Sequence, residues 1–141
     1  MAAALEVIGE RWTWLIIRDA FLGLRTFAEF HGSLGIAKNV LSVRLNRLVE
    51  DGVFERKLYS ARPERYEYCL TEKGRDLFTA LNALRQWGDE YLSPKPMRLL
   101  RRKADHAPVI AALVPEGSAV LAHDEMELVP GPGFPHADRS N

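Results

Sequence analysis

The chain has 141 residues, of which 47% are apolar and 27% are charged. This balance is typical of a folded globular domain and excludes an intrinsically disordered chain. The formal net charge is zero, so a nucleic-acid-binding surface would require a local concentration of basic residues. The single cysteine excludes a disulfide framework within the chain and suits a reducing cytoplasm, and the longest apolar run is too short to span a bilayer.

The first predicted element is one amphipathic helix that runs from the start of the chain to about Gly23. Apolar side chains recur in it at helical spacing, at Leu5, Ile8, Trp12 and Ile16. Glycine is favoured at the end of a helix, which places the predicted end near Gly23.

A short second helix is predicted to begin at Thr26. Threonine is a favourable N-cap, and Glu29 three residues later completes the pattern of a capping box. We expect Gly32 and Gly35 to break this helix and leave a short turn.

The third predicted helix runs from about Ala37 to Asp51 and ends at Gly52. Leu41, Leu45 and Leu48 share one of its faces, which we expect to pack against the core. Two short helices joined by a tight, glycine-containing turn are typical of a helix-turn-helix.

A β-hairpin is predicted next, from the change to a period of two. Its strands are expected at residues 53–59 and 65–70, with a polar turn at residues 60–64. A long helix is then predicted from Thr71 to about Tyr91.

The segment Ser93-Pro94-Lys95-Pro96 predicts a break in the chain. We therefore expect a main domain over residues 1–92 and an extension over residues 93–141, with a frayed end from residue 130. Two short strands, at residues 109–114 and 120–129, are predicted to form a hairpin in this extension. The basic run within residues 95–103 is interpreted as a solvated helix face, with a supplementary phosphate contact as the less favoured alternative. The predicted fold class is mainly α with a small β wing (α+β), a winged helix-turn-helix with a partly β extension.

The face of the third helix opposite its leucines carries side chains suited to reading DNA. The major groove admits an α-helix, asparagine can pair with adenine through two hydrogen bonds, and an apolar side chain can contact the thymine methyl group. The expected base-reading residues are Asn39, Ser42, Val43 and Asn46. Lys38, Arg44 and Arg47 flank them and are expected to contact phosphates. Arg44 has an alternative role, in which it braces the module by pairing with a carboxylate on a neighbouring helix.

The hairpin is predicted to act as a wing that contacts the DNA backbone or minor groove. Its candidate contact residues are Lys57, Tyr59, Ser60, Arg62 and Arg65. Arg25 and Thr26, at the start of the second helix, are further candidates.

Several motifs taken together resemble the HxlR family of winged-helix regulators. They are the Gly-Glu-Arg-Trp-Thr segment at residues 9–13, Phe27 with Glu29, Leu41-Ser42 with Arg44-Leu45, Glu50-Asp51-Gly52, and Glu67-Tyr68 with Leu70-Thr71 and Gly74. The resemblance covers roughly residues 4 to 92.

The resemblance implies a homodimer that binds a pseudo-palindromic site in double-stranded DNA, as a repressor or an activator, with repression favoured here. A cytoplasmic location is expected from the single cysteine. The expected dimer contacts come from the first helix and the long later helix, at Leu5, Ile8, Leu84, Trp87 and Tyr91. Members often respond to a small-molecule effector, whose identity the sequence does not give here. Many carry a sensing cysteine just before the first helix; this chain has none there, so that mode of sensing is not supported.

Other chemistries have weaker sequence support. Cys69 is interpreted mainly as a passive strand residue, with redox sensing as the less favoured alternative. The histidines form no metal-binding pattern, so no metal and no cofactor are expected. No catalytic motif is found, and the chain is not expected to be an enzyme. A winged helix that binds another protein, without binding DNA, is the alternative function.

Overall fold

The computed structural model describes residues 1–93 and 95–135. The chain divides into two compact units, Met1–Phe78 and Thr79–Asn141, which we call the N-terminal and the C-terminal unit. This division falls earlier than the predicted functional boundary between residues 92 and 93, which stays a prediction. The predicted break at Pro94 and residues 136–141 of the predicted frayed end lie outside the described residues.

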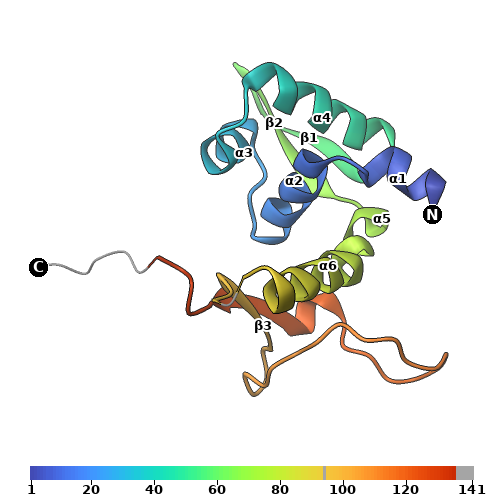
Figure 1. Cartoon of the computed structure of the whole chain (residues 1–141). Coiled ribbons are helices and arrows are strands. Elements are labelled where there is room, and N and C mark those ends of the chain that lie inside the picture. Colours follow the sequence, from blue (N-terminus) through green and yellow to red (C-terminus); the bar gives the residue numbers. More distant parts are fainter. Residues whose placement is uncertain (94, 136–141) are drawn as a thin grey trace, which may run out of the picture. The chain divides into compact units, whose positions relative to one another are not determined.

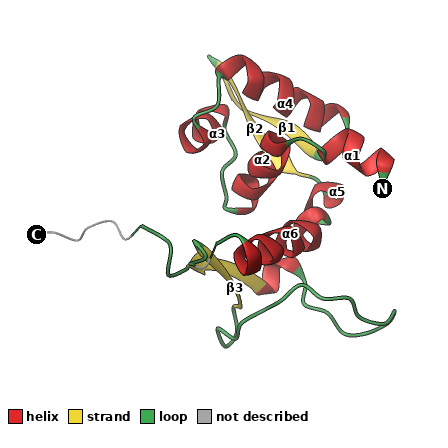
Figure 2. Cartoon of the chain, viewed as in Figure 1, coloured by secondary structure: helices red, strands yellow, loops and turns green. Residues whose placement is uncertain are grey.

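The N-terminal unit consists of short helices and one β-hairpin (Figures 1 and 2). Its elements in chain order are α1 (Ala2–Ile8), α2 (Arg11–Phe21), α3 (Phe27–Leu34), α4 (Lys38–Glu50), β1 (Phe54–Ala61), β2 (Glu64–Leu70) and α5 (Glu72–Arg75). The next helix, α6 (Leu77–Tyr91), begins in this unit and continues into the other. The order of helices, hairpin and helix confirms the predicted winged helix-turn-helix.

The prediction of a single first helix is wrong, because the helix is interrupted at Gly9 and Glu10. The amide of Gly9 donates to the carbonyl of Leu5 at 2.8 Å and ends α1, while Glu10 is extended, with φ −103° and ψ 141°. A Cβ atom at residue 9 would overlap the carbonyl oxygen of Leu5, so only glycine fits this close approach. The apolar pattern continues across the break, and for that reason the sequence periodicity did not reveal it.

The predicted capping box of α3 is confirmed. The amide of Glu29 donates to Thr26 Oγ1 at 3.3 Å, and the amide of Thr26 donates to Glu29 Oε2 at 2.8 Å. The expectation that Gly32 breaks this helix is wrong: α3 continues to Leu34 and ends at Gly35, whose φ of 61° is left-handed. A glycine inside a helix weakens it but does not end it when the neighbouring residues pack well.

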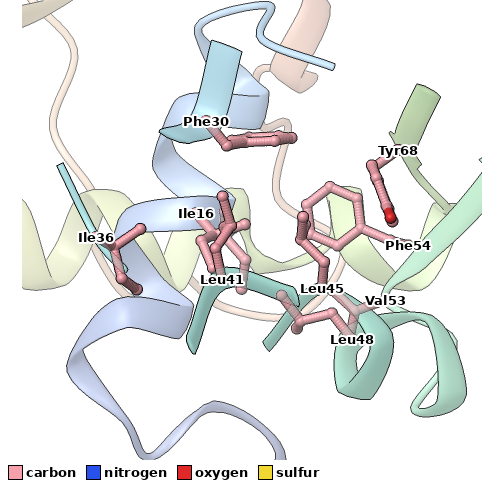
Figure 3. Packing of buried hydrophobic residues seen from close by; sticks show 10 residues of the cluster. Ile16, Phe30, Ile36, Leu41, Leu45, Leu48, Val53, Phe54 and Tyr68 are labelled. Carbon is pink, nitrogen blue, oxygen red and sulfur yellow. The ribbon is translucent and has the colours of Figure 1, made fainter. Parts of the chain in front are cut away.

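The third predicted helix is confirmed as α4, and its three leucines are buried. Leu41 and Leu45 are fully covered and Leu48 is 1% exposed. They pack in one cluster with apolar residues from the surrounding elements, among them Ile16, Phe30, Ile36, Val53, Phe54 and Tyr68 (Figure 3). The rings of Phe30 and Phe54 meet edge to face at 6.3 Å. This core fixes which face of α4 remains outside.

The hairpin is confirmed, but its turn is shorter than predicted. β1 and β2 pair antiparallel from Phe54 opposite Leu70 to Ala61 opposite Glu64, which leaves Arg62-Pro63 as the connection. The residues predicted as a five-residue turn therefore belong largely to the strands. The register shifts between Leu58 and Ser60, so Tyr59 lies at an irregularity in the ladder.

The prediction of one continuous helix after the hairpin is also wrong, because α5 and α6 are separated at Asp76. Thr71 begins α5 by accepting a hydrogen bond from the amide of Gly74 at 3.1 Å, and its hydroxyl donates to the carbonyl of Gly52 at 2.6 Å. Gly74 lies directly against the carbonyl of Val53. These contacts hold α5 on the turn between α4 and β1. Because they join residues that are distant in the sequence, the local apolar pattern could not predict them.

The C-terminal unit contains most of α6 and a second small sheet. β3 (Arg98–Arg102) pairs antiparallel with β4 (Met126–Pro130), and η1 (His123–Glu125) immediately precedes β4. The predicted strand at residues 109–114 is wrong, and only the end of the predicted 120–129 strand is strand. The middle of the basic run, Arg98–Arg102, is a strand rather than a helix face, because Leu99 pairs with Val129 and Leu100 is buried at 5% exposure. Within the described residues, no helix has the length and apolar character needed to cross a membrane.

Candidate nucleic-acid interface

The exposed face of α4 presents the four predicted base-reading side chains together. Asn39, Ser42, Val43 and Asn46 follow the spacing of one helix face and are all exposed, Val43 at 61%. Among the described residues, neither asparagine side chain has a hydrogen-bond partner. Their amide groups are therefore available to an external partner, while the buried leucines on the opposite face hold the helix in place.

The basic residues beside this face differ in their exposure and in whether they form an ion pair. Lys38 is exposed at the first turn of α4, and Arg47 pairs with Asp51 one turn later at 3.0 Å. Arg44 is mostly covered and pairs with Glu10. This pairing agrees with the alternative bracing role for Arg44, and it makes Arg44 the least available of the three for a phosphate.

The candidate residues of the wing lie along the hairpin and at its end. Arg62 and Arg65 are exposed, Tyr59 is 49% exposed, and Ser60 is half-buried. Lys57 pairs with Glu55 at 2.8 Å, and this hydrogen bond raises the pKa of the lysine. Glu55 therefore offsets part of the positive charge at Lys57, whereas Arg62 and Arg65 keep theirs.

Arg56 is a wing residue that the sequence analysis did not assign to the interface. Its guanidinium lies 4.3 Å from the ring centre of Tyr66 on the opposite strand, in a cation–π contact. The hydroxyl of Tyr66 donates to Glu64 at 3.0 Å, which raises the pKa of the tyrosine. Arg56 and Leu58 point to the same face of the hairpin, where they neighbour Tyr66 and Tyr68 on the paired strand. The alternation of residues along the two strands was the signal for this arrangement in the sequence.

The start of α3 is tied to the wing by its backbone. The amide of Tyr68 donates to the carbonyl of Arg25 at 2.7 Å, and Thr26 forms a β-bridge with Glu67. The side chain of Arg25 is exposed, while the hydroxyl of Thr26 caps α3. These backbone contacts join the segment before α3 to the wing.

The predicted dimer contacts are mostly exposed apolar side chains. Leu5 on α1 is 54% exposed, and on α6 the exposures are 50% for Leu84, 55% for Trp87 and 70% for Tyr91. Ile8 is half-buried and packs partly against the core of its own unit. Exposed aromatic and aliphatic side chains at helical spacing are typical of a contact surface.

Other candidate chemistry is sparse in the described part of the chain. Cys69 is half-buried in β2 and forms no disulfide. No group of three or more metal-ligating side chains comes together among the described residues. Trp12 packs against the core.

A helix held by its leucines, an exposed polar face on that helix and an adjoining basic hairpin define a winged helix-turn-helix of the DNA-binding class. Comparison with known proteins agrees with this class. The model of the HxlR-like helix-turn-helix family matches residues 7–96. The chain belongs to this family of transcriptional regulators.

Similar proteins are named as transcriptional regulators or transcription factors. An uncharacterized HTH-type transcriptional regulator of Mycobacterium tuberculosis is 47% identical over 135 residues, which cover 93% of this chain and 85% of the relative. The crystal structure of PA1607, described as a transcription factor, is 45% identical with a TM-score of 0.70 and covers 85% of this chain and 87% of its own. The reduced form of the transcriptional regulator YodB from Bacillus subtilis is 30% identical with a TM-score of 0.58, over 67% of this chain and 93% of its own.

Proposed function

We propose that this chain is a sequence-specific repressor that binds a pseudo-palindromic operator as a homodimer. The observation that carries the proposal is the exposed face of α4, where Asn39, Ser42, Val43 and Asn46 lie opposite three buried leucines. A helix presented in this way can enter the major groove with its side chains against the base edges.

The proposed roles divide the interface into base contacts and backbone contacts. Asn39 and Asn46 read bases through their amide groups, and Val43 contacts a thymine methyl group. The hydroxyl of Ser42 can donate a hydrogen bond to a base or accept one from it. Lys38, Arg47, Arg62 and Arg65 neutralise phosphates, which sets affinity and register rather than sequence preference. Arg44 is paired with Glu10 and contributes less to binding, whereas the exposed side chain of Arg25 can contact a phosphate.

The homodimer is proposed from the exposed apolar residues of α1 and α6. Leu5, Leu84, Trp87 and Tyr91 would lose contact with water in a symmetric pair, which is favourable. Two copies would then place two α4 helices on half-sites about 34–36 Å apart, or one helical turn of DNA.

A small-molecule effector is the least specified part of the proposal. A ligand that binds the dimer would raise its melting temperature. It would also change the affinity of the dimer for DNA by the same factor by which bound DNA changes the affinity for the ligand. We propose action in the cytoplasm, on double-stranded DNA and without enzymatic activity, as expected of a regulator family.

The proposal is tested by selecting bound duplexes from a random pool with the purified chain. Enrichment of a sequence with two related half-sites supports it. The matched variants Asn46→Ala and Arg62→Ala separate the two kinds of contact, since the first should relax base preference and the second should weaken all duplexes alike. Recovery of a partner protein, with no enriched duplex, would favour the protein-interaction alternative that the neutral net charge keeps open.

A further inference from the structure

A long arm in the C-terminal unit has no role in the proposed DNA interface. Residues 111–122 connect the segment beside β3 to η1, and they contain no helix or strand. A turn in the middle of the arm reverses the chain: the amide of Ser118 donates to the carbonyl of Pro115 at 3.1 Å, and Gly117 has a φ of 82°. Figure 1 shows this arm as an extended orange loop that projects away from α6 and β3.

The arm carries apolar side chains that are not packed against the rest of the chain. Leu113 is fully exposed, Val120 is 72% exposed and Val114 is 52% exposed. Covering aliphatic side chains such as these is favourable, and a concentration of them on an exposed segment indicates a contact with another molecule.

The same unit contains a groove that could receive such side chains. It lies between α6, β3 and the segment before the arm, with a volume of about 450 Å³. Its apolar lining consists of Pro96, Leu99, Leu100, Pro108, Val109 and Ile110. Arg85, Asp89, Glu90 and Arg101 supply charged groups to the lining.

The arm is anchored at its first residue and then leaves the groove. The amide of Ala111 donates to Gln86 Oε1 at 2.9 Å, and Gln86 Nε2 donates to the carbonyl of Ala111 at 3.4 Å. Gln86 itself lines the groove. Each chain therefore supplies this groove and, starting at its lining, this arm that extends beyond it.

We propose that the groove of each copy receives the arm of a second copy, so that the two arms are exchanged reciprocally. This inference rests on the homodimer of the proposed function. Because each chain supplies one arm and one groove, a two-fold pair satisfies both and leaves no further site open for chain growth. The groove also shares α6 with the predicted contact residues Trp87 and Tyr91, so the two apolar surfaces belong to one helix.

One basic side chain of the groove, Arg101, can pair with a carboxylate of the arm. Glu116 is the only charged residue in the arm. Arg101 donates from Nη1 to the carbonyl of His106 at 2.7 Å and has no carboxylate partner among the described residues. An arm seated in the partner's groove by Leu113 and Val114 would bring Glu116 within reach of Arg101, because only Pro115 separates Val114 from Glu116.

The exchange is tested with two chains that each carry one thiol. In a Cys69→Ser background, one chain carries Leu113→Cys and the other, of different size because of a tag, carries Glu90→Cys. Since no single chain holds two cysteines, a disulfide between these positions can form only across copies, where the Cα atoms approach within roughly 4–7 Å. We expect a covalent heterodimer on a non-reducing gel after mixing and mild oxidation. A matched pair with Glu72→Cys on α5 in place of Glu90→Cys should give little of this product.

The outcomes separate the arm exchange from the dimer itself. If the parent chain is a dimer by light scattering but the heterodimer band does not exceed the Glu72→Cys control, the arm exchange is wrong and the homodimer stands. If the parent chain is a monomer, both are wrong. A disulfide that forms only when Leu113→Cys and Glu90→Cys occupy one chain would show the arm in its own groove and overturn the exchange.

A second measurement does not depend on disulfide formation. Leu113→Asp should raise the dimer dissociation constant by about tenfold or more, because an apolar contact is replaced by a buried charge. Ser118→Asp, in the turn in the middle of the arm, should have a much smaller effect. Both side chains are exposed, so neither variant should prevent folding. Equal dimer dissociation constants for Leu113→Asp and the parent chain would contradict the exchange.

Discussion

Arg44, in the middle of α4, forms an ion pair with Glu10, the residue that precedes α2. The pair joins the helix proposed to enter DNA to the break between the first two helices, and only a structure could show it because the two residues are far apart in sequence. We therefore expect Arg44 to serve first to position α4.

A double-mutant cycle tests this positioning role. Glu10 is largely exposed, so the pair should contribute only about 0.2–1 kcal/mol to the free energy of unfolding, as exposed ion pairs do. Glu10→Gln, Arg44→Met and the double variant should give a coupling energy in that range by urea denaturation. Purely additive effects would show that the two side chains do not interact in solution.

The leucine face of α4 should dominate the stability of the N-terminal unit. Leu45→Ala is expected to lower the free energy of unfolding by about 2–5 kcal/mol, because the residue is fully buried and the substitution leaves a cavity. Val43→Ala, two residues earlier on the exposed face, should change it by less than about 0.5 kcal/mol. A cost at Val43 similar to that at Leu45 would mean that α4 is rotated relative to the structure described above.

Two glycines should respond in opposite ways to alanine. Gly74→Ala should destabilise the chain, because its Cβ atom would overlap the carbonyl of Val53. Gly32→Ala meets no atom nearby and lies inside α3, so it should stabilise the chain by about 0.4–1 kcal/mol. Thermal or urea unfolding of the two variants gives the comparison. A stabilised Gly74→Ala variant would contradict the contact between α5 and the turn after α4.

The capping box of α3 should make stability depend on acid pH. The amides of Arg25 and Thr26 donate to the Glu29 carboxylate and lower its pKa below the ordinary value of 4.5. A lowered pKa in the folded state gives stability that is fully present above the unfolded-state pKa and is lost as pH falls through the folded-state pKa. The parent chain should therefore lose more stability than Glu29→Gln on acidification below about pH 4.5. Glutamine keeps a capping side chain without titrating, so parallel pH profiles would assign the effect to other groups.

The helix-turn-helix and hairpin could be predicted because their signals are local. The Thr26–Glu29 capping box, the spacing of Leu41, Leu45 and Leu48, and the alternation before Leu70 each depend on residues a few positions apart. The spacing of the leucines also predicted which face of α4 is exposed.

The errors fall where distant parts of the chain decide the outcome. Gly9 interrupts a continuous apolar pattern by approaching Leu5, and Thr71 and Gly74 are held by the turn after α4. In the C-terminal unit, the basic residues of β3 did not look like a strand, yet Leu99 and Leu100 bring them into a ladder with β4. Strand pairing across residues 103–125, which separate β3 from β4, has no sequence signature of its own.

The two classes of proposed DNA contact should separate in binding experiments. Asn46→Ala should reduce discrimination between the selected duplex and a base-substituted one by about 1–3 kcal/mol, because it removes an amide from the exposed face of α4. Arg62→Ala should weaken both duplexes alike and make the slope of log affinity against log salt shallower by about 0.9. Equal loss of discrimination in both variants would contradict the assigned roles.

Binding of the parent chain to a selected two-half-site duplex, measured as a function of salt, tests most directly whether α4 and the wing hold DNA. We expect log affinity to fall linearly with log salt, at a slope of about −0.9 for each phosphate neutralised, and to remain higher for the selected duplex than for a scrambled one at every salt concentration. Affinity that is independent of salt, or equal for the two duplexes throughout, would contradict sequence-specific binding by this surface.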